Sequence, residues 1–116
     1  MLDLIHSKKI IDEQRKKIIL ESMADKYCKL ILKNTLENPK SAMIIAQEEK
    51  IPLSTVYRKI KKLSDGKLLA ISGSINKDGK KYFLYMSKIR EINTHWSVTE
   101  TKIDCVLNNP RPEDIN

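Results

Sequence analysis

Ile51-Pro52-Leu53-Ser54-Thr55-Val56-Tyr57-Arg58-Lys59-Ile60-Lys61-Lys62-Leu63 is the stretch that decides the fold of this chain. Its apolar residues Val56, Ile60 and Leu63 recur at helical spacing, and most of the residues between them carry hydroxyl groups or positive charges. No acidic residue interrupts the chain from Lys50 to Ser64. Because a helix with one buried stripe and a basic, hydroxyl-bearing face fits the major groove of DNA, this segment predicts a DNA-binding helix.

Helical periodicity also marks the chain before this segment. Residues 24–37 predict a helix that ends at Asn38-Pro39, because proline disfavours helix in the residue before it. Ser41 suits the N-cap of a short helix over 42–49. Residues 8–23 favour another helix by their apolar spacing, although Ile18-Ile19-Leu20 alone would also suit a strand.

The end of the quoted helix and the pattern after it predict a change to strands. Asp65-Gly66 is a helix stop, since glycine takes the left-handed conformation cheaply. Residues 68–75 and 81–86 then alternate with period 2 around Asn76-Lys77-Asp78-Gly79-Lys80, and Asp-Gly between alternating strands is a strong hairpin signal. A weaker alternation predicts a second hairpin over 89–108, whose turn lacks the glycine or proline that usually marks one.

Helix, helix, turn, helix and hairpin is the order of a winged helix-turn-helix domain. Ala46 stands where the motif's first helix places a small residue, and Val56, ten positions later, stands where the recognition helix contacts it. Residues 18–88 as a whole resemble the ArsR-like winged-helix transcriptional regulators of archaea and bacteria. The resemblance is carried by Ala46, Val56, Ser54-Thr55-Val56-Tyr57-Arg58, Asp65-Gly66-Lys67-Leu68-Leu69 and the segment Leu20 to Leu32.

The resemblance implies an α+β fold with a three-helix core and a β-hairpin wing, extended by an N-terminal helix and a second C-terminal hairpin. The expected organisation is a helical extension for dimerisation over 1–23, the DNA-binding domain over 24–88, a β-hairpin over 89–108 and a flexible tail over 109–116. Two departures stand out. Lys50 occupies the usual glycine position, which suggests a wider turn, and the metal-sensing cysteine box is absent, so no metal or other cofactor is expected.

The distribution of charge agrees with a nucleic-acid partner. The chain of 116 residues has a formal net charge of +7. Its residues 91–116 contain five acids and two bases, a net of −3, so residues 1–90 carry +10. A positive field of this kind favours nucleic acid or an anionic membrane surface, and the plain alternative is a protein with many exposed lysines.

By the resemblance, the helix over 53–64 enters the major groove and the hairpin tip lies on the DNA backbone. Arg58 is the candidate for bidentate contact with guanine, because its planar fork matches two acceptors on one base edge. Tyr57 fits a DNA contact and packing at the helix margin equally well. The predicted DNA-binding residues are Ser54, Thr55, Tyr57, Arg58, Lys61, Lys62, Lys77, Lys80 and Lys81. The three hairpin lysines could instead blunt an exposed edge.

Apolar residues at both ends of the chain have no place in a minimal winged helix. They are Leu2, Leu4, Ile5, Ile11, Ile92, Trp96, Ile103 and Leu107. A homodimer interface is the economical explanation for them, since a two-fold protein reads a two-fold operator. The alternative is that they complete the core of the monomer.

Other functions are disfavoured by what the sequence lacks. His6 and His95 are the only histidines and have no ligand or acid–base spacing, and no phosphate-binding glycine loop or nucleophile motif occurs, so an enzyme is not expected. Cys28 and Cys105 form no metal spacing and suit buried thiols, with a redox role as the alternative.

The location of the protein and its partners are predicted from two further features that the sequence lacks. No apolar run is long enough to span a membrane and the start lacks the features of a signal peptide, which predicts a cytoplasmic protein without a membrane partner. The expected function is a DNA-binding transcriptional regulator that reads double-stranded DNA, with its effector unknown. Because winged helices also mediate protein contacts, the alternative is an interaction or architectural component of a transcription complex.

Overall fold

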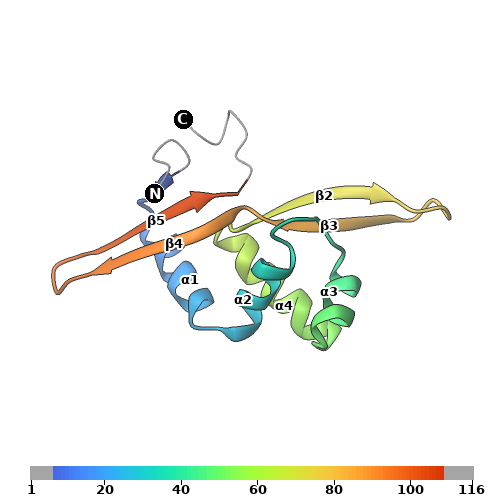
Figure 1. Cartoon of the computed structure of the whole chain (residues 1–116), viewed down its shortest axis with the longest axis horizontal. Coiled ribbons are helices and arrows are strands. Elements are labelled where there is room, and N and C mark those ends of the chain that lie inside the picture. The colour runs from blue at the N-terminus through green and yellow to red at the C-terminus, as the bar shows by residue number, and fades with distance from the viewer. Residues whose placement is uncertain (1–6, 109–116) are drawn as a thin grey trace.

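The computed structural model describes residues 7–108, which form four helices and two antiparallel sheets. In Figure 1 the helices lie on one side of the sheets, and two hairpins project at opposite ends of a molecule that measures 53 × 31 × 25 Å. The predicted α+β class is confirmed. The elements are β1 (Ser7–Ile10), α1 (Glu13–Met23), α2 (Lys26–Asn34), α3 (Ala42–Glu49), α4 (Leu53–Asp65), β2 (Leu69–Ile75), β3 (Lys81–Ser87), β4 (Ile89–Trp96) and β5 (Thr101–Leu107).

Helix α4 lies at the centre of the helical layer and packs against α1, α2 and α3. Val56, Ile60 and Leu63 are buried along one side of it, as their spacing predicted. Burying each such side chain is worth about 1.5–3 kcal/mol relative to leaving it exposed. The stripe that identifies the helix in the sequence therefore also fixes its orientation, with the polar residues between turned outward.

Side-chain caps set where the other helices begin. Asp12 accepts a hydrogen bond from the backbone N–H of Arg15 (2.8 Å) at the start of α1, and Asp25 accepts two at the start of α2. Ser41 accepts one from the N–H of Ile44 (3.2 Å), which confirms its predicted role as the N-cap of α3. These caps satisfy donors that a helix end leaves without internal partners.

The prediction of a single helix over 8–23 is wrong at its beginning. Ser7–Ile10 forms strand β1, and α1 starts only at Glu13. The physical reason is a distant partner: β1 pairs antiparallel with β5, and Ile10 lies opposite Ile103, with both side chains buried. The helix predicted over 24–37 is also shorter, because Ala24 ends α1 and Asp25 caps α2.

Two lysines take the left-handed backbone conformation that was expected only of glycine. Lys50 ends α3 with φ 55° and ψ 47°, which is the backbone conformation that glycine would adopt there. The suggestion that lysine changes the conformation of this turn is therefore wrong. Gly66 has φ −82°, which corrects the prediction that it would be left-handed, and Lys67 has φ 58° instead. Gly66 is needed for space, because a Cβ there would lie 3.0 Å from Cγ2 of Ile18.

The first hairpin, β2–β3, is confirmed where the alternation and the Asp-Gly turn predicted it. Gly73 lies opposite Phe83 in its register. A third segment joins this sheet, which the sequence did not suggest: the N–H and C=O of Lys40 bond to Tyr85 at 3.0 and 2.8 Å. This bridge ties the chain between α2 and α3 to β3 and so holds the hairpin against the helices.

The second hairpin, β4–β5, is also confirmed, and it forms a three-stranded sheet in the order β1-β5-β4. Of the apolar residues expected to need burial, Ile103 is fully buried and completes the monomer core, whereas Ile92 and Leu107 are half-buried. Trp96 and Ile11 remain 69% and 77% exposed.

Residues 1–6 and 109–116 lie outside the described range. The expectations for Leu2, Leu4, Ile5 and the tail over 109–116 therefore concern residues that the structure does not describe. Among the helices formed by residues 7–108, none has the length and apolar character to cross a membrane.

Candidate nucleic-acid interface

The outward side of α4 carries a basic stripe made of Ser54, Arg58 and Lys61, which follow one another at helical spacing. All three are exposed and lie away from the buried stripe of the helix. Lys61 forms an exposed pair with Asp65 one turn later (3.2 Å), an interaction that solvent screens and that is worth little. Arg58 forms no ion pair with any carboxylate of residues 7–108. Its guanidinium is therefore available to a ligand.

Two other lysines of α4 are used inside the molecule. Lys59 forms an ion pair with Asp25 at the start of α2, and Lys62 forms one with Glu21 of α1 (3.2 Å). The side chain of Lys62 is 35% exposed, against 78% for Lys61. Lys62, a predicted DNA contact, thus belongs to the side of α4 that faces α1 rather than to the basic stripe.

The pair between Asp25 and Lys59 has an electrostatic consequence for the carboxylate. Burial by itself would raise the pKa of Asp25. The hydrogen bond from Lys59 and those from the backbone N–H groups of Cys28 and Tyr27 outweigh burial, and the pKa lies below its ordinary value. Asp25 is therefore ionised at neutral pH and holds α4 to the start of α2.

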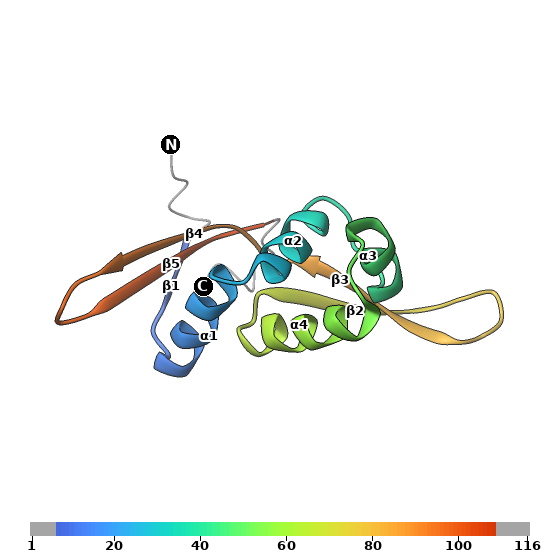
Figure 2. The same cartoon turned by 90° about the horizontal axis from the view of Figure 1, so that it is seen from below.

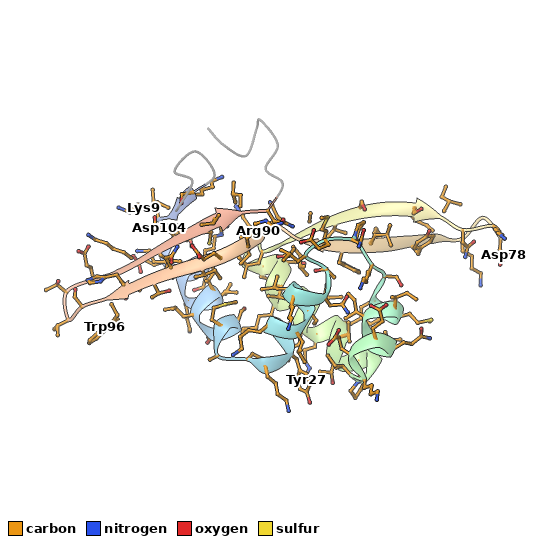
Figure 3. All side chains as sticks on the ribbon, in the orientation of Figure 1. Lys9, Tyr27, Asp78, Arg90, Trp96 and Asp104 are labelled. Atoms are coloured by element: carbon orange, nitrogen blue, oxygen red, sulfur yellow. The ribbon has the colours of Figure 1, made fainter. Side chains whose placement is uncertain are left out.

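The tip of the first hairpin carries the second group of predicted DNA contacts. Lys77, Lys80 and Lys81 are all exposed. The side-chain oxygen of Asn76 accepts hydrogen bonds from the N–H groups of Asp78 and Lys80, both at 2.9 Å, and so orders the tip. Figure 3 shows Asp78 at the far end of this hairpin. Lys77 and Lys80 thus lie at the tip itself, whereas Lys81 begins β3.

Helix α4 and the first hairpin share one region of the surface. Figure 2 shows the first hairpin projecting beyond α3, and Tyr57 of α4 lines the same hollow as residues of this hairpin. An open groove of about 400 Å³, here called the aromatic groove, lies between the beginning of α3 and the hairpin, with Tyr57 of α4 in its lining. It is lined by Ser41, Ala42, Met43, Tyr57, Asn76, Lys81, Tyr82, Phe83 and Tyr85. No acidic residue lines it, and sequence reasoning missed it because its parts come from α3, α4 and β3.

The position of Tyr57 links α4 to this groove. Its side chain is 53% exposed, whereas Tyr85 is buried in the groove wall. Burial and then the nearby hydroxyl of Tyr57 raise the pKa of Tyr85 above its usual value. Thr55, another predicted contact, is half-buried. Seven of the nine predicted DNA contacts therefore belong to the basic stripe, to the groove (Tyr57 and Lys81) or to the hairpin tip, whereas Thr55 and Lys62 lie outside these groups.

The two cysteines and His95 are the thiol and imidazole groups within the described residues. Cys28 and Cys105 are free, buried thiols, and burial raises the pKa of both. His95 lies exposed on β4, as predicted for a strand residue. Within residues 7–108 no cluster of three or more His, Cys, Asp or Glu side chains is arranged to hold a metal ion.

Comparison of the chain with protein-family models, with curated proteins and with solved structures gave no match. The geometry of the surface itself is therefore the basis for assigning a function.

Proposed function

We propose that this protein is a winged helix-turn-helix transcriptional regulator that binds double-stranded DNA, with α4 in the major groove and the first hairpin as the wing. The observations that carry the proposal are the exposed basic stripe on the outward side of α4 and the exposed lysines at the tip of the first hairpin. The order of α2, α3 and α4 followed by β2–β3, with Lys40 bridged to β3, supports the winged-helix assignment. A basic helix beside a basic hairpin suits a polyanion with a groove.

The residues of this surface suit different parts of the DNA. Arg58 has a planar fork that matches guanine O6 and N7, and Ser54 at the start of the helix can bond a base edge or a phosphate. Lys61, Lys77 and Lys80 present point charges that neutralise phosphates, which adds affinity and salt dependence without reading sequence.

A homodimer is part of the proposal. Trp96 and Val98, 69% and 90% exposed, lie at the tip of the second hairpin, at the end of the molecule opposite the wing. Exposed aromatic residues of this size are typical of protein contact surfaces. Placing the dimer contact at this end leaves both wings and both α4 helices free for two half-sites.

The proposal is tested by first selecting bound sequences from a random duplex pool at physiological salt. A two-fold motif is expected for a dimeric regulator. No enrichment together with salt-dependent binding would instead favour the architectural role.

On the selected duplex, Arg58→Ala should weaken binding by roughly tenfold or more, because one bidentate contact with guanine is worth about 1–3 kcal/mol. Arg58→Lys should recover only part of this loss, since lysine keeps the charge but lacks the planar fork. Fluorescence anisotropy at fixed salt measures both effects.

The matched control is Lys33→Ala, an exposed lysine on α2 that lies beside β4 of the other sheet, which should leave the affinity unchanged. Equal affinity of the Arg58→Ala variant and the unmodified protein would show that α4 is not the reading helix.

A further inference from the structure

The aromatic side chains of this chain are concentrated in one place. The sequence holds one Phe, one Trp and four Tyr, and four of these six residues line the aromatic groove. Its volume of about 400 Å³ lies within the range of about 300–1,000 Å³ that is usual for small-molecule sites. Packing in the hydrophobic core does not explain why these four residues lie together, because most of their side chains are not buried.

The exposure of the rings indicates an open stacking surface. Tyr57 and Phe83 remain 53% and 47% exposed. Phe83 lies opposite Gly73 in the hairpin, so no cross-strand side chain covers its ring. A Cβ built at Gly73 would contact only the side chain of Lys81, at 3.4 Å. No side chain of β2 therefore covers Phe83; the side chain of Lys81 lies over part of its ring, and the rest stays open to solvent.

The charged residues around the groove indicate which kind of ligand suits it. Lys81 places its ammonium 5.4 Å from the centre of the Phe83 ring, and the groove has no acidic lining residue. Lys77 and Lys80 lie farther along the same hairpin, and Arg58 directly follows Tyr57. A ligand that combines flat rings with negative charges fits this setting, and an unpaired nucleotide has both, since bases stack on aromatic side chains and phosphates pair with lysine.

We infer that the aromatic groove binds an unpaired nucleobase of the DNA strand that passes between α4 and the wing. The base stacks on Phe83 beside Tyr57, and Lys81 neutralises the adjoining phosphate. This inference rests on the proposed DNA-binding function. It goes beyond that function because a paired duplex keeps its bases stacked inside and has none to place in the groove. The protein should therefore prefer DNA that offers an unpaired base.

The test compares three labelled DNAs by fluorescence anisotropy at one salt concentration: a paired duplex, the same duplex with a single bulged thymidine, and an unstructured thymidine strand. The bulged duplex should bind about tenfold more tightly than the paired one, the scale of one base stacked on an aromatic ring. Replacing the bulged base by 2-aminopurine should give a fluorescence change on binding that reports stacking directly.

Variants at Phe83 separate stacking from general apolar contact. Phe83→Leu keeps an apolar side chain but has no ring, so it should lose the preference for the bulge while its affinity for the paired duplex changes less than about twofold. Phe83→Tyr keeps the ring and should keep the preference.

The outcomes distinguish this inference from the proposed function. Equal affinity for paired and bulged duplexes overturns the groove inference and leaves duplex binding intact. Binding of the bulge or of the thymidine strand without binding of the paired duplex supports the groove and overturns the proposed major-groove role. A preference for the bulge that survives in Phe83→Leu assigns it to another part of the protein, and no binding to any of the three DNAs overturns both.

Discussion

Lys50 shows how a single backbone conformation affects stability. It ends α3 in the left-handed region with φ 55°, and an L-residue with a side chain is strained there by about 1–2 kcal/mol. The helix-turn-helix motif that we propose for this segment usually has glycine at this position, and Lys50 adopts the backbone conformation that glycine favours. The next residue explains why. Ile51 is buried, and the N–H of Ile51 donates a hydrogen bond to the carbonyl of Ala46 (3.1 Å).

Lys50→Gly should therefore stabilise the protein by about 1 kcal/mol, because glycine adopts this conformation without a steric conflict, less its larger entropy loss on folding. Urea unfolding followed by circular dichroism measures the change. Glu49→Gly, one residue earlier and within α3, should have the opposite sign, since glycine weakens a helix. A loss of stability in the Lys50→Gly variant would contradict the role given to this backbone angle.

At the scale of elements, α4 is held by ion pairs on one side and left free on the other. Lys59 and Lys62 bind carboxylates at the start of α2 and on α1, whereas Arg58 points away from both. The spacing of Val56, Ile60 and Leu63 was enough to predict the helix and its buried stripe. It was not enough to divide the lysines, because their partners lie on other helices.

Asp25 makes the most testable of these element contacts. Its pKa is lowered in the folded protein, so its stabilising effect is present above the unfolded pKa and is lost as the pH falls through the folded pKa. Asp25→Asn keeps a good N-cap but removes the charge. It should destabilise the protein by about 1 kcal/mol at neutral pH, the upper range for a partly exposed ion pair, and the difference should shrink below about pH 4 as the carboxyl protonates.

Thermal unfolding of the two proteins between pH 3 and pH 7 checks this. As a control, Asp78→Asn changes an exposed carboxylate at the hairpin tip, far from α2, and should give no comparable pH-dependent difference. A gap between Asp25→Asn and the unmodified protein that stayed constant across this range would rule out the charge of Asp25 as its cause.

At the scale of the whole molecule, the two hairpins have different surfaces. The first carries lysines at its tip, and the second carries the exposed apolar side chains of Trp96 and Val98. The surface around Trp96 includes charges of both signs, which suits a symmetric contact in which the same patch meets itself. Its charged residues are Lys9, Glu13, Lys16, Glu100 and Lys102. Ser7, where the described chain begins, is paired with Val106, away from this tip.

Trp96→Ser should therefore convert the proposed dimer to a monomer in sedimentation velocity runs at low micromolar concentration. The substitution removes little packing from the core, because the ring is 69% exposed. Loss of core packing should therefore not lower the melting temperature of the monomer. Ile71→Ser, which changes an exposed apolar residue of the other hairpin, is the matched control and should leave the dimer intact. An unmodified protein that stays monomeric at high concentration would refute the proposed dimer.

The sequence by itself determined α3 with its Ser41 cap, α4 and both hairpins, because spacing, capping and turn chemistry act within a few residues of the chain. Only the tertiary structure decided which lysines of α4 are free, that Ser7–Ile10 is a strand, and that Lys40 joins β3. The aromatic groove belongs to the same group, since its rings come from separate elements. The physical reason is common to all of these: an ion pair, a strand partner or a groove wall is a contact between residues distant in the chain, and local periodicity carries no record of it.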